Sequence, residues 1–165
     1  MEDGSGCQVG AKSRSELLAL VDDEWRGLMA LLEGLPEEEL LRPGAVGRWS
    51  AHDLLCHIAT WEEEFIAAAP IILAGKPLPR YGNIDAFNAR QQERWRGLSL
   101  AEAWQRARDV HRRLLECLES LPYIPGRTEA RLRRRLRWDT YHHYREHAQQ
   151  VREWRELLGK GSGGA

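Results

Sequence analysis

The sequence has few cysteines, no long apolar run and almost no net charge. Its 165 residues include three cysteines with no CxxC spacing, and no basic start precedes an apolar segment at the N-terminus, so we expect a reduced, cytoplasmic protein. The longest uncharged apolar run, Phe65 to Gly75, is too short to cross a bilayer. A net charge of -1 argues against a dedicated nucleic-acid binder.

Signatures of several catalytic classes are also missing. Neither a Ser-His-Asp arrangement nor a phosphate-binding glycine loop is present. Cys56 and Cys117 lie off the apolar faces of their predicted helices, so neither is the expected nucleophile. At 42% hydrophobic residues the chain can bury a core without disulfides or a structural metal. Any bound metal is therefore expected to be functional.

Helical periodicity dominates the chain, and no segment alternates as a strand does. We predict a disordered leader over residues 1–13, one domain over 14–158 and a flexible tail over 159–165. Four amphipathic helices begin at Ser15, Ser50, Ser99 and near Arg127, and a shorter one spans Asp85 to Trp95. The pattern predicts an all-α, antiparallel four-helix bundle with a short accessory helix between the second and third main helices.

Two of these helices carry a strong N-terminal signal. Ser50 is followed three residues later by Asp53, and Ser99 by Glu102. A serine at the cap and an acid at the third helical position satisfy each other's backbone N–H groups. We therefore expect capping boxes at both positions.

Histidines gather in the stretch Asp139 to His147, which falls in the last predicted helix. On a helical wheel His143 and His147 share the apolar face, whereas His142 lies on the opposite, solvent side. Histidines at i and i+4 can reach one divalent ion. Alternatively, each could be a buried polar residue that is satisfied by hydrogen bonds. Both interpretations stay open at this point.

Other polar residues fall near the apolar face of the second main helix. His57 lies at its border, a position that suits either a metal ligand or a half-exposed side chain. Glu62 falls within it, where a carboxylate needs a partner: it could act as the acid or base of a site, orient a ligand histidine or pair with an arginine. We expect His111 to be a core histidine and His52 to be exposed.

Six arginines lie in the segment from Arg127 to Arg137. They could bind the carboxylates of a small thiol, another anionic partner or DNA. A solvated start of the last helix, balanced by acidic residues elsewhere, is the interpretation we favour, and it makes a nucleic-acid partner unlikely.

Two stretches, Trp49 to Glu63 and Asp139 to Val151, resemble the DinB/YfiT-like superfamily of four-helix bundles, and within it the ClbS/DfsB-type branch. The resemblance implies a divalent metal, usually zinc or nickel, bound by His57, His143 and His147. Metal-dependent relatives include thiol-dependent transferases and the maleylpyruvate isomerase type. The ClbS type instead hydrolyses the reactive ring of a DNA-damaging metabolite, and its activity is not generally tied to a metal.

Three functions follow as hypotheses. The first is a metal-dependent hydrolase or thiol-dependent transferase that acts on a small electrophilic molecule, with a low-molecular-weight thiol as a further cofactor. The second is a metal-free protective hydrolase or sequestering protein for a reactive metabolite. The third is a non-catalytic helical module that forms a homodimer.

Overall fold

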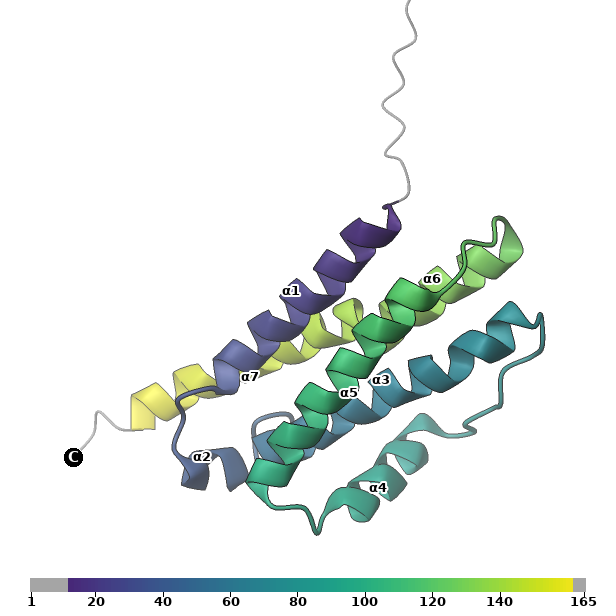
Figure 1. The fold of residues 1–165 in the computed structure, drawn as a ribbon. Helices are drawn as coiled ribbons and strands as arrows, with labels where there is room; N and C mark the ends of the chain where they lie inside the picture. Colours follow the sequence, from purple (N-terminus) through teal and green to yellow (C-terminus); the bar gives the residue numbers. More distant parts are fainter. Residues whose placement is uncertain (1–11, 162–165) are drawn as a thin grey trace, which may run out of the picture.

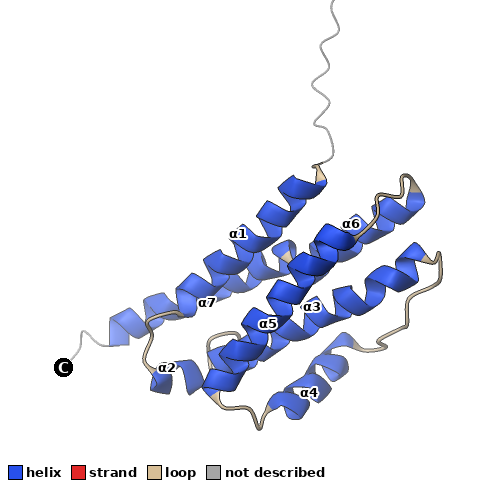
Figure 2. Cartoon of the chain, in the orientation of Figure 1, coloured by secondary structure: helices blue, strands red, loops and turns tan. Residues whose placement is uncertain are grey.

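The computed structural model describes residues 12–161, which form seven α-helices and no β-strand (Figure 1). Figure 2 shows that loops only connect the helices. The long helices are α1 (Arg14–Leu32), α3 (Ala51–Leu73), α5 (Leu100–Ser120) and the consecutive pair α6 (Arg127–Asp139) and α7 (Tyr141–Gly161). These make a four-helix bundle, as expected. The accessory helix is α4 (Ile84–Trp95), and a short α2 (Glu37–Leu41), which the sequence did not predict, follows α1.

Not all neighbouring helices of the bundle run antiparallel. The expected direction holds for α3 against α7, since Glu62 bonds to Tyr144 while His57, earlier in α3, lies beside His147, later in α7. By contrast, α3 and α5 run the same way (Figure 1). The physical reason is the connection over residues 74–99, which includes α4 and carries the chain back along the bundle before α5 begins.

The predicted capping boxes are present at Ser50 and Ser99. The Asp53 carboxylate accepts hydrogen bonds of 2.9 Å from both the backbone N–H and the hydroxyl of Ser50. The Ser50 hydroxyl in turn accepts from the Asp53 backbone N–H at 3.1 Å. A further box at Ser13, closed by Glu16, starts α1 slightly earlier than expected. These caps fix where each bundle helix begins.

The last main helix is interrupted at Thr140, where the sequence predicted a continuous helix. Thr140 is fully buried and has φ -131° and ψ -110°, outside the helical region. Its hydroxyl donates to the carbonyl of Leu136 at 2.5 Å, and its backbone N–H donates to the same oxygen at 3.0 Å. The non-helical backbone of Thr140 separates α6 from α7.

One apolar core joins the main helices. It includes fully buried side chains from each of α1, α3, α5 and α7, among them Leu28, Leu54, Ile58, Leu114 and Val151. Pro70 lies inside α3 without ending it, and the helix continues to Leu73. Residues 1–11 of the expected leader lie outside the described residues, and α7 extends to Gly161, past the expected start of the tail.

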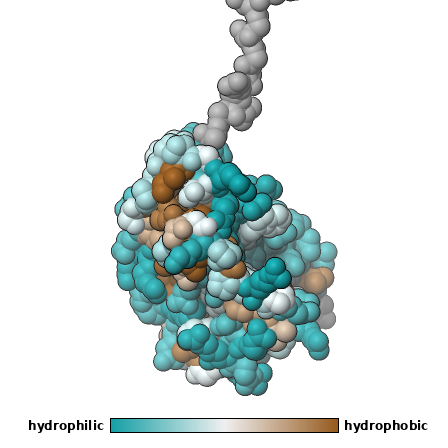
Figure 3. Space-filling view, turned by 90° about the vertical axis from the view of Figure 1, so that its right-hand side faces the viewer, coloured by the Kyte–Doolittle hydropathy of each residue, from teal (hydrophilic) through white to brown (hydrophobic). Residues whose placement is uncertain are grey.

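The face of the molecule in Figure 3 is mainly hydrophilic, with hydrophobic residues in patches among the hydrophilic ones. Within residues 12–161, no helix combines the length and apolar character needed to cross a membrane.

Candidate metal centre

Three histidines from two helices meet in the middle of the bundle. His57 comes from α3, and His143 and His147 come from successive turns of α7. The Nε2 atom of His143 lies 2.9 Å from Nε2 of His57 and 2.9 Å from Nε2 of His147. A ring nitrogen of each residue lies within 4.8 Å of those of the other two. The pair predicted from the i, i+4 spacing and the separate histidine of α3 are therefore brought together.

Neighbouring side chains fix how these rings are turned. The amide oxygen of Gln150 accepts a hydrogen bond of 2.7 Å from Nδ1 of His147, which leaves Nε2 of that ring without its proton. The indole of Trp49 packs against His57 with 4.5 Å between ring centroids. A hydrogen bond from the far nitrogen of a histidine is the usual means of orienting it toward a metal.

All three imidazoles are held in the neutral form. Burial is the largest cause in each case: it lowers the pKa of His143 to about 3 and the pKa of His57 well below its usual range, and it also lowers the pKa of His147. The mutual proximity of the rings lowers the pKa of His57 and His143 further, because two imidazolium ions would repel each other. Neutral imidazole is the form that binds metals.

The donor set fits a divalent metal. A neutral imidazole carries one proton on its two nitrogens, and His147 uses its proton at Nδ1, so the lone pair of its Nε2 faces the other two histidines. Nitrogens held at about 2.1 Å from a tetrahedral zinc stand about 3.4 Å apart. The observed 2.9 Å contacts lie within a small side-chain adjustment of that spacing. Three protein ligands also leave at least one coordination position open.

The three histidines line a pocket of about 480 Å³. Its other lining residues are three tryptophans, an isoleucine, two amides and two acids: Trp49, Trp61, Trp138, Ile84, Asn88, Gln150, Asp139 and Glu146. Helix α4 supplies the isoleucine and Asn88. The accessory helix therefore forms one wall of the pocket rather than part of the bundle.

Trp61 is held firmly in this wall. Its indole N–H donates to the side-chain oxygen of Asn88 at 3.2 Å. Its ring packs against Phe87 and Tyr81 at centroid distances of 5.3 and 5.5 Å. Trp61 was not predicted as a site residue, although it stands one helical turn after His57.

Asp139, which lines the pocket, forms a mostly buried pair with Arg135. Arg135 Nε donates to an Asp139 oxygen at 2.5 Å, and another guanidinium nitrogen donates to the Tyr81 hydroxyl at 2.6 Å. Tyr81 in turn donates to Glu64 at 2.6 Å. Burial raises the pKa of Asp139 to about 7, and the charge of Arg135 opposes that rise. The hydrogen-bonding groups of Arg135 are therefore directed at Asp139 and Tyr81.

Glu62 lies in the core and does not line the pocket. Its Oε1 atom accepts hydrogen bonds from the Tyr144 hydroxyl at 2.6 Å and from Nδ1 of His111 at 2.9 Å. Nε2 of His111 lies 3.3 Å from an Asp22 oxygen, and its ring stacks on Trp25 at 4.2 Å. Burial raises the pKa of Glu62, while both hydrogen bonds act against the rise. Glu62 thus ties α3 to α5 and α7, and it contacts none of the three clustered histidines.

The remaining histidines lie elsewhere. His111 is a core residue, as expected, and His142 is half-buried beside Trp138, outside the cluster. His52 was expected to be exposed, but it is buried, with Nε2 2.8 Å from the carbonyl oxygen of Leu98. That carbonyl precedes α5 and is distant in sequence, so the first turn of α3 alone gave no sign of the contact.

Three of the six arginines of α6, Arg131, Arg133 and Arg135, bind groups of this chain. Arg133 pairs with Glu129 at 2.6 Å and donates to the carbonyl of Lys12, and Arg131 donates to the carbonyl of Lys76. These partners differ from the acidic clusters that the sequence suggested. Arg127, Arg134 and Arg137 are exposed, and the prediction that this segment is a solvated helix surface rather than an open anion site stays a prediction.

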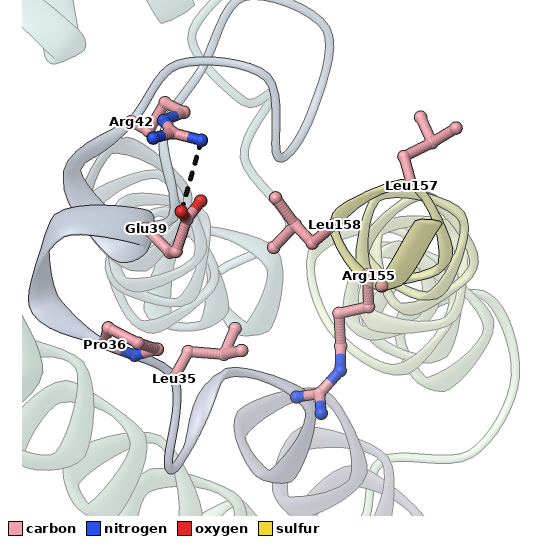
Figure 4. Close-up of a pocket in the computed structure, with 8 residues that line it drawn as sticks. Leu35, Pro36, Glu39, Arg42, Arg155, Leu157 and Leu158 are labelled. Atoms are coloured by element: carbon pink, nitrogen blue, oxygen red, sulfur yellow. Dashed lines mark ion pairs between the residues drawn. The ribbon is translucent and has the colours of Figure 1, made fainter. Parts of the chain in front are cut away.

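A larger cavity, of about 650 Å³, lies at the end of the bundle between α2 and the end of α7 (Figure 4). The charged residues in its wall are already bonded. Arg42 pairs with Glu39 at 3.2 Å, and Arg155 donates to the carbonyl of Leu31. This cavity holds no cluster of metal ligands, so we place the candidate site at the histidines.

A family model described as the DinB superfamily matches residues 20–154. The chain belongs to the DinB superfamily. The matched range includes the whole histidine cluster and all but the ends of this DinB-type bundle. None of the curated proteins compared with the sequence matches it.

Solved structures share the fold at low sequence identity. An uncharacterised protein from Escherichia coli UTI89 superposes with a TM-score of 0.76 at 14% identity, covering 90% of this chain and 96% of that one. DfsB, described as a sibling lethal factor precursor, gives 0.75 at 16% identity over 90% and 98%. The colibactin self-resistance protein ClbS, in complex with a double-stranded DNA, gives 0.71 at 14% identity over 88% and 97%. The expected ClbS/DfsB-type fold is therefore confirmed for this DinB superfamily member.

Proposed function

We propose that this protein is a divalent-metal-dependent enzyme, a hydrolase or a thiol-dependent transferase, that acts on a small electrophilic molecule. The observation that carries the proposal is the convergence of three neutral imidazole nitrogens at the wall of a pocket of about 480 Å³. Zinc and nickel are the metals we expect, because both accept nitrogen ligands readily.

In this proposal some residues of the pocket bind the metal and others shape the space around it. His57, His143 and His147 would bind the metal, with Gln150 keeping the lone pair of His147 turned toward it. When bound there, a divalent metal acts as a Lewis acid that activates water or a thiol as the nucleophile. The indoles of Trp49 and Trp61 flank the histidines and keep bulk water from one side of the pocket.

Glu62 does not serve this proposal as the acid or base that the sequence suggested. It lies behind Tyr144, and its contacts suit it to positioning α7 against α3. An acid or base for the reaction is better sought at the pocket wall, where Asp139 and Glu146 lie.

Metal analysis tests the proposal directly. The full-length chain, purified without a histidine tag, is analysed for transition metals before and after incubation with zinc or nickel. We expect about one equivalent in the unmodified protein and less than about a tenth in His143→Ala. His142→Ala is the matched control, since the adjacent histidine lies outside the cluster, and it should bind as the unmodified protein does. Less than a tenth of an equivalent in all three proteins would refute the proposal.

A second function is favoured by the fold comparison. ClbS is a self-resistance protein, and DfsB is a precursor of a lethal factor. We infer as the alternative a metal-free protein that hydrolyses or sequesters a reactive metabolite in the same pocket. A His143→Ala variant that protects cells or DNA from an electrophile as well as the unmodified protein does would favour this alternative. The expected homodimer and cytoplasmic location stay predictions.

A further inference from the structure

Two side-chain amides line the histidine pocket, and the oxygen of each is already bonded. The side-chain oxygen of Asn88 accepts a hydrogen bond of 3.2 Å from the indole N–H of Trp61. An indole N–H can only donate, so the Asn88 oxygen faces Trp61 and the NH₂ group of the same amide points elsewhere. The side-chain oxygen of Gln150 likewise accepts from Nδ1 of His147 at 2.7 Å.

The amide nitrogens are the free ends of these two side chains. Among residues 12–161, no group accepts a hydrogen bond from Nδ2 of Asn88 or from Nε2 of Gln150. An amide NH₂ group carries two donors and cannot accept. A ligand that displaces water from such a donor loses affinity unless it offers an acceptor in return. The wall of the pocket is therefore suited to a ligand with an acceptor atom.

Asn88 is the better placed of the two amides for recognising a ligand, because its partner does not belong to the histidine cluster. Phe87, its neighbour in α4, packs against Trp61 with 5.3 Å between ring centroids. The Trp61 ring in turn lies 6.4 Å from the ring of His57 and 6.3 Å from that of His143. The Asn88 amide is thus fixed on a side chain that stands beside two of the clustered histidines.

The charged groups around the pocket do not give a comparable preference. The Asp139 carboxylate is paired with Arg135, whose guanidinium carbon lies 5.9 Å from the centre of the Trp61 ring. Glu146 is 59% exposed and lies 3.8 Å from His142. A divalent cation on the three histidines would attract a carbonyl oxygen, as an amide N–H does. The cation and the amide therefore favour the same kind of ligand atom.

We propose that the pocket binds a small molecule through a carbonyl oxygen, as in a ketone, an ester or a lactam, and that Asn88 determines this specificity. The Asn88 amide donates to the carbonyl oxygen, and the indoles of the lining pack against the flat unsaturated part of the molecule. The inference rests on the proposed function for the location of the site, and it names the class of electrophile. The hydrogen bond itself needs no metal.

Two probes of nearly equal shape, the ketone indanone and the hydrocarbon indane, isolate the carbonyl oxygen. Full-length, ¹⁵N-labelled protein is treated with a chelator and titrated with each probe, and the side-chain NH₂ signals are followed by NMR. The Asn88 signals are assigned in the unmodified protein. We expect indanone to shift the Asn88 NH₂ protons downfield and indane not to do so. No saturable binding of indanone, or the same response of these protons to both probes, would overturn the inference.

Asn88→Asp removes the two donors and nearly keeps the shape of the side chain. Its carboxylate still accepts from the indole N–H of Trp61, so the wall should stay in place. We expect the variant to bind indanone at least about fivefold more weakly and to change the binding of indane by less than about twofold. An equal loss for both probes would show that the amide donors do not recognise the carbonyl oxygen.

Asn83→Asp is the matched control. Asn83 is the exposed N-cap of α4 and does not line the pocket, and aspartate caps a helix about as well as asparagine does. The control makes the same change of an amide to a carboxylate on the same segment, and it should bind both probes as the unmodified protein does. A loss of indanone binding as large as in Asn88→Asp would contradict the assignment to Asn88.

Metal analysis of the same preparations, before the chelator is added, keeps this inference apart from the proposed function. Recognition of the carbonyl oxygen by a protein that binds no metal would refute the metal-dependent function alone. About one equivalent of metal, together with unchanged indanone binding in Asn88→Asp, would refute the carbonyl specificity alone.

Discussion

The Tyr144 hydroxyl donates a hydrogen bond of 2.6 Å to Oε1 of Glu62, and both side chains are fully buried. Tyr144 follows His143 directly in the chain, so this bond holds the turn of α7 that carries His143 against α3. The bond lies behind the pocket rather than in it. We therefore expect the loss of this hydrogen bond to lower the free energy of unfolding rather than to change the lining of the pocket.

Tyr144→Phe should lower the free energy of unfolding by about 1–2 kcal/mol, because one buried acceptor loses a donor while the ring stays in place. Urea unfolding of the metal-free protein measures this. Tyr123→Phe is the control: Tyr123 is 68% exposed, and its substitution should change stability by less than about 0.5 kcal/mol. An unchanged stability in Tyr144→Phe would show that the bond contributes nothing.

The lowered pKa of His143 makes the stability of the metal-free protein depend on pH. Its pKa is 6.5 in the unfolded reference and about 3 when folded. Above pH 6.5 both states are neutral at this residue. Between 6.5 and 3 only the unfolded chain binds the proton, so stability falls as pH falls, by up to about 1.4 kcal/mol per pH unit.

His143→Gln should remove this contribution. Its free energy of unfolding should therefore decline less steeply between pH 6 and pH 4 than that of the unmodified protein, as measured by urea unfolding at several pH values. His142→Gln, which changes the half-buried neighbour, serves as control. Parallel pH profiles for His143→Gln and the unmodified protein would contradict the burial of a neutral imidazole.

The capping box of α3 offers a third measurement. Ser50→Ala removes a hydroxyl that bonds to both the backbone N–H and the carboxylate of Asp53, and should cost about 1 kcal/mol. Ser120→Ala, near the end of α5, removes an exposed hydroxyl that bonds to a preceding carbonyl, and should cost less than about 0.5 kcal/mol. If thermal unfolding showed the same loss of stability in Ser50→Ala and Ser120→Ala, the cap would contribute no more than an exposed hydroxyl does.

Double-stranded DNA is the partner of ClbS in its solved complex. For this chain we expect no binding to a labelled duplex tighter than about 10⁻⁶ M at physiological salt, because its net charge is -1 and several arginines of α6 bind their own neighbours. Fluorescence anisotropy checks this. Should binding be tight, Arg134→Ala and Arg137→Ala, at exposed positions of α6, would test whether that helix is the contact surface.

Local signals in the sequence predicted much of this fold. The capping boxes at Ser50 and Ser99 depend on residues three apart, and the alignment of His143 with His147 depends on helical periodicity alone. Each is specified within one turn or two. Apart from the interruption at Thr140, the long helices and the i, i+4 pair were accordingly found where the pattern placed them.

Features that depend on distant contacts were missed. His52 is buried where its ring donates a hydrogen bond to the carbonyl oxygen of Leu98. The break at Thr140 is marked in the sequence by neither a glycine nor a proline. The aromatic wall of the pocket assembles from segments separated by dozens of residues, and Trp138 gives no periodic signal of its position there. Spacing from the histidines could have indicated Trp61 and Gln150, which lie one turn from His57 and His147.

The interruption at Thr140 divides the wall of the pocket between two helices. Trp138 and Asp139 belong to α6, which packs on α3, whereas His143 and His147 belong to α7, which packs on α1. We therefore expect substitutions in α6 to change the entrance of the pocket more than the spacing of His143 and His147, which are fixed one turn apart on α7. A library of variants confined to α6 would alter which small molecules enter the pocket while keeping that histidine pair.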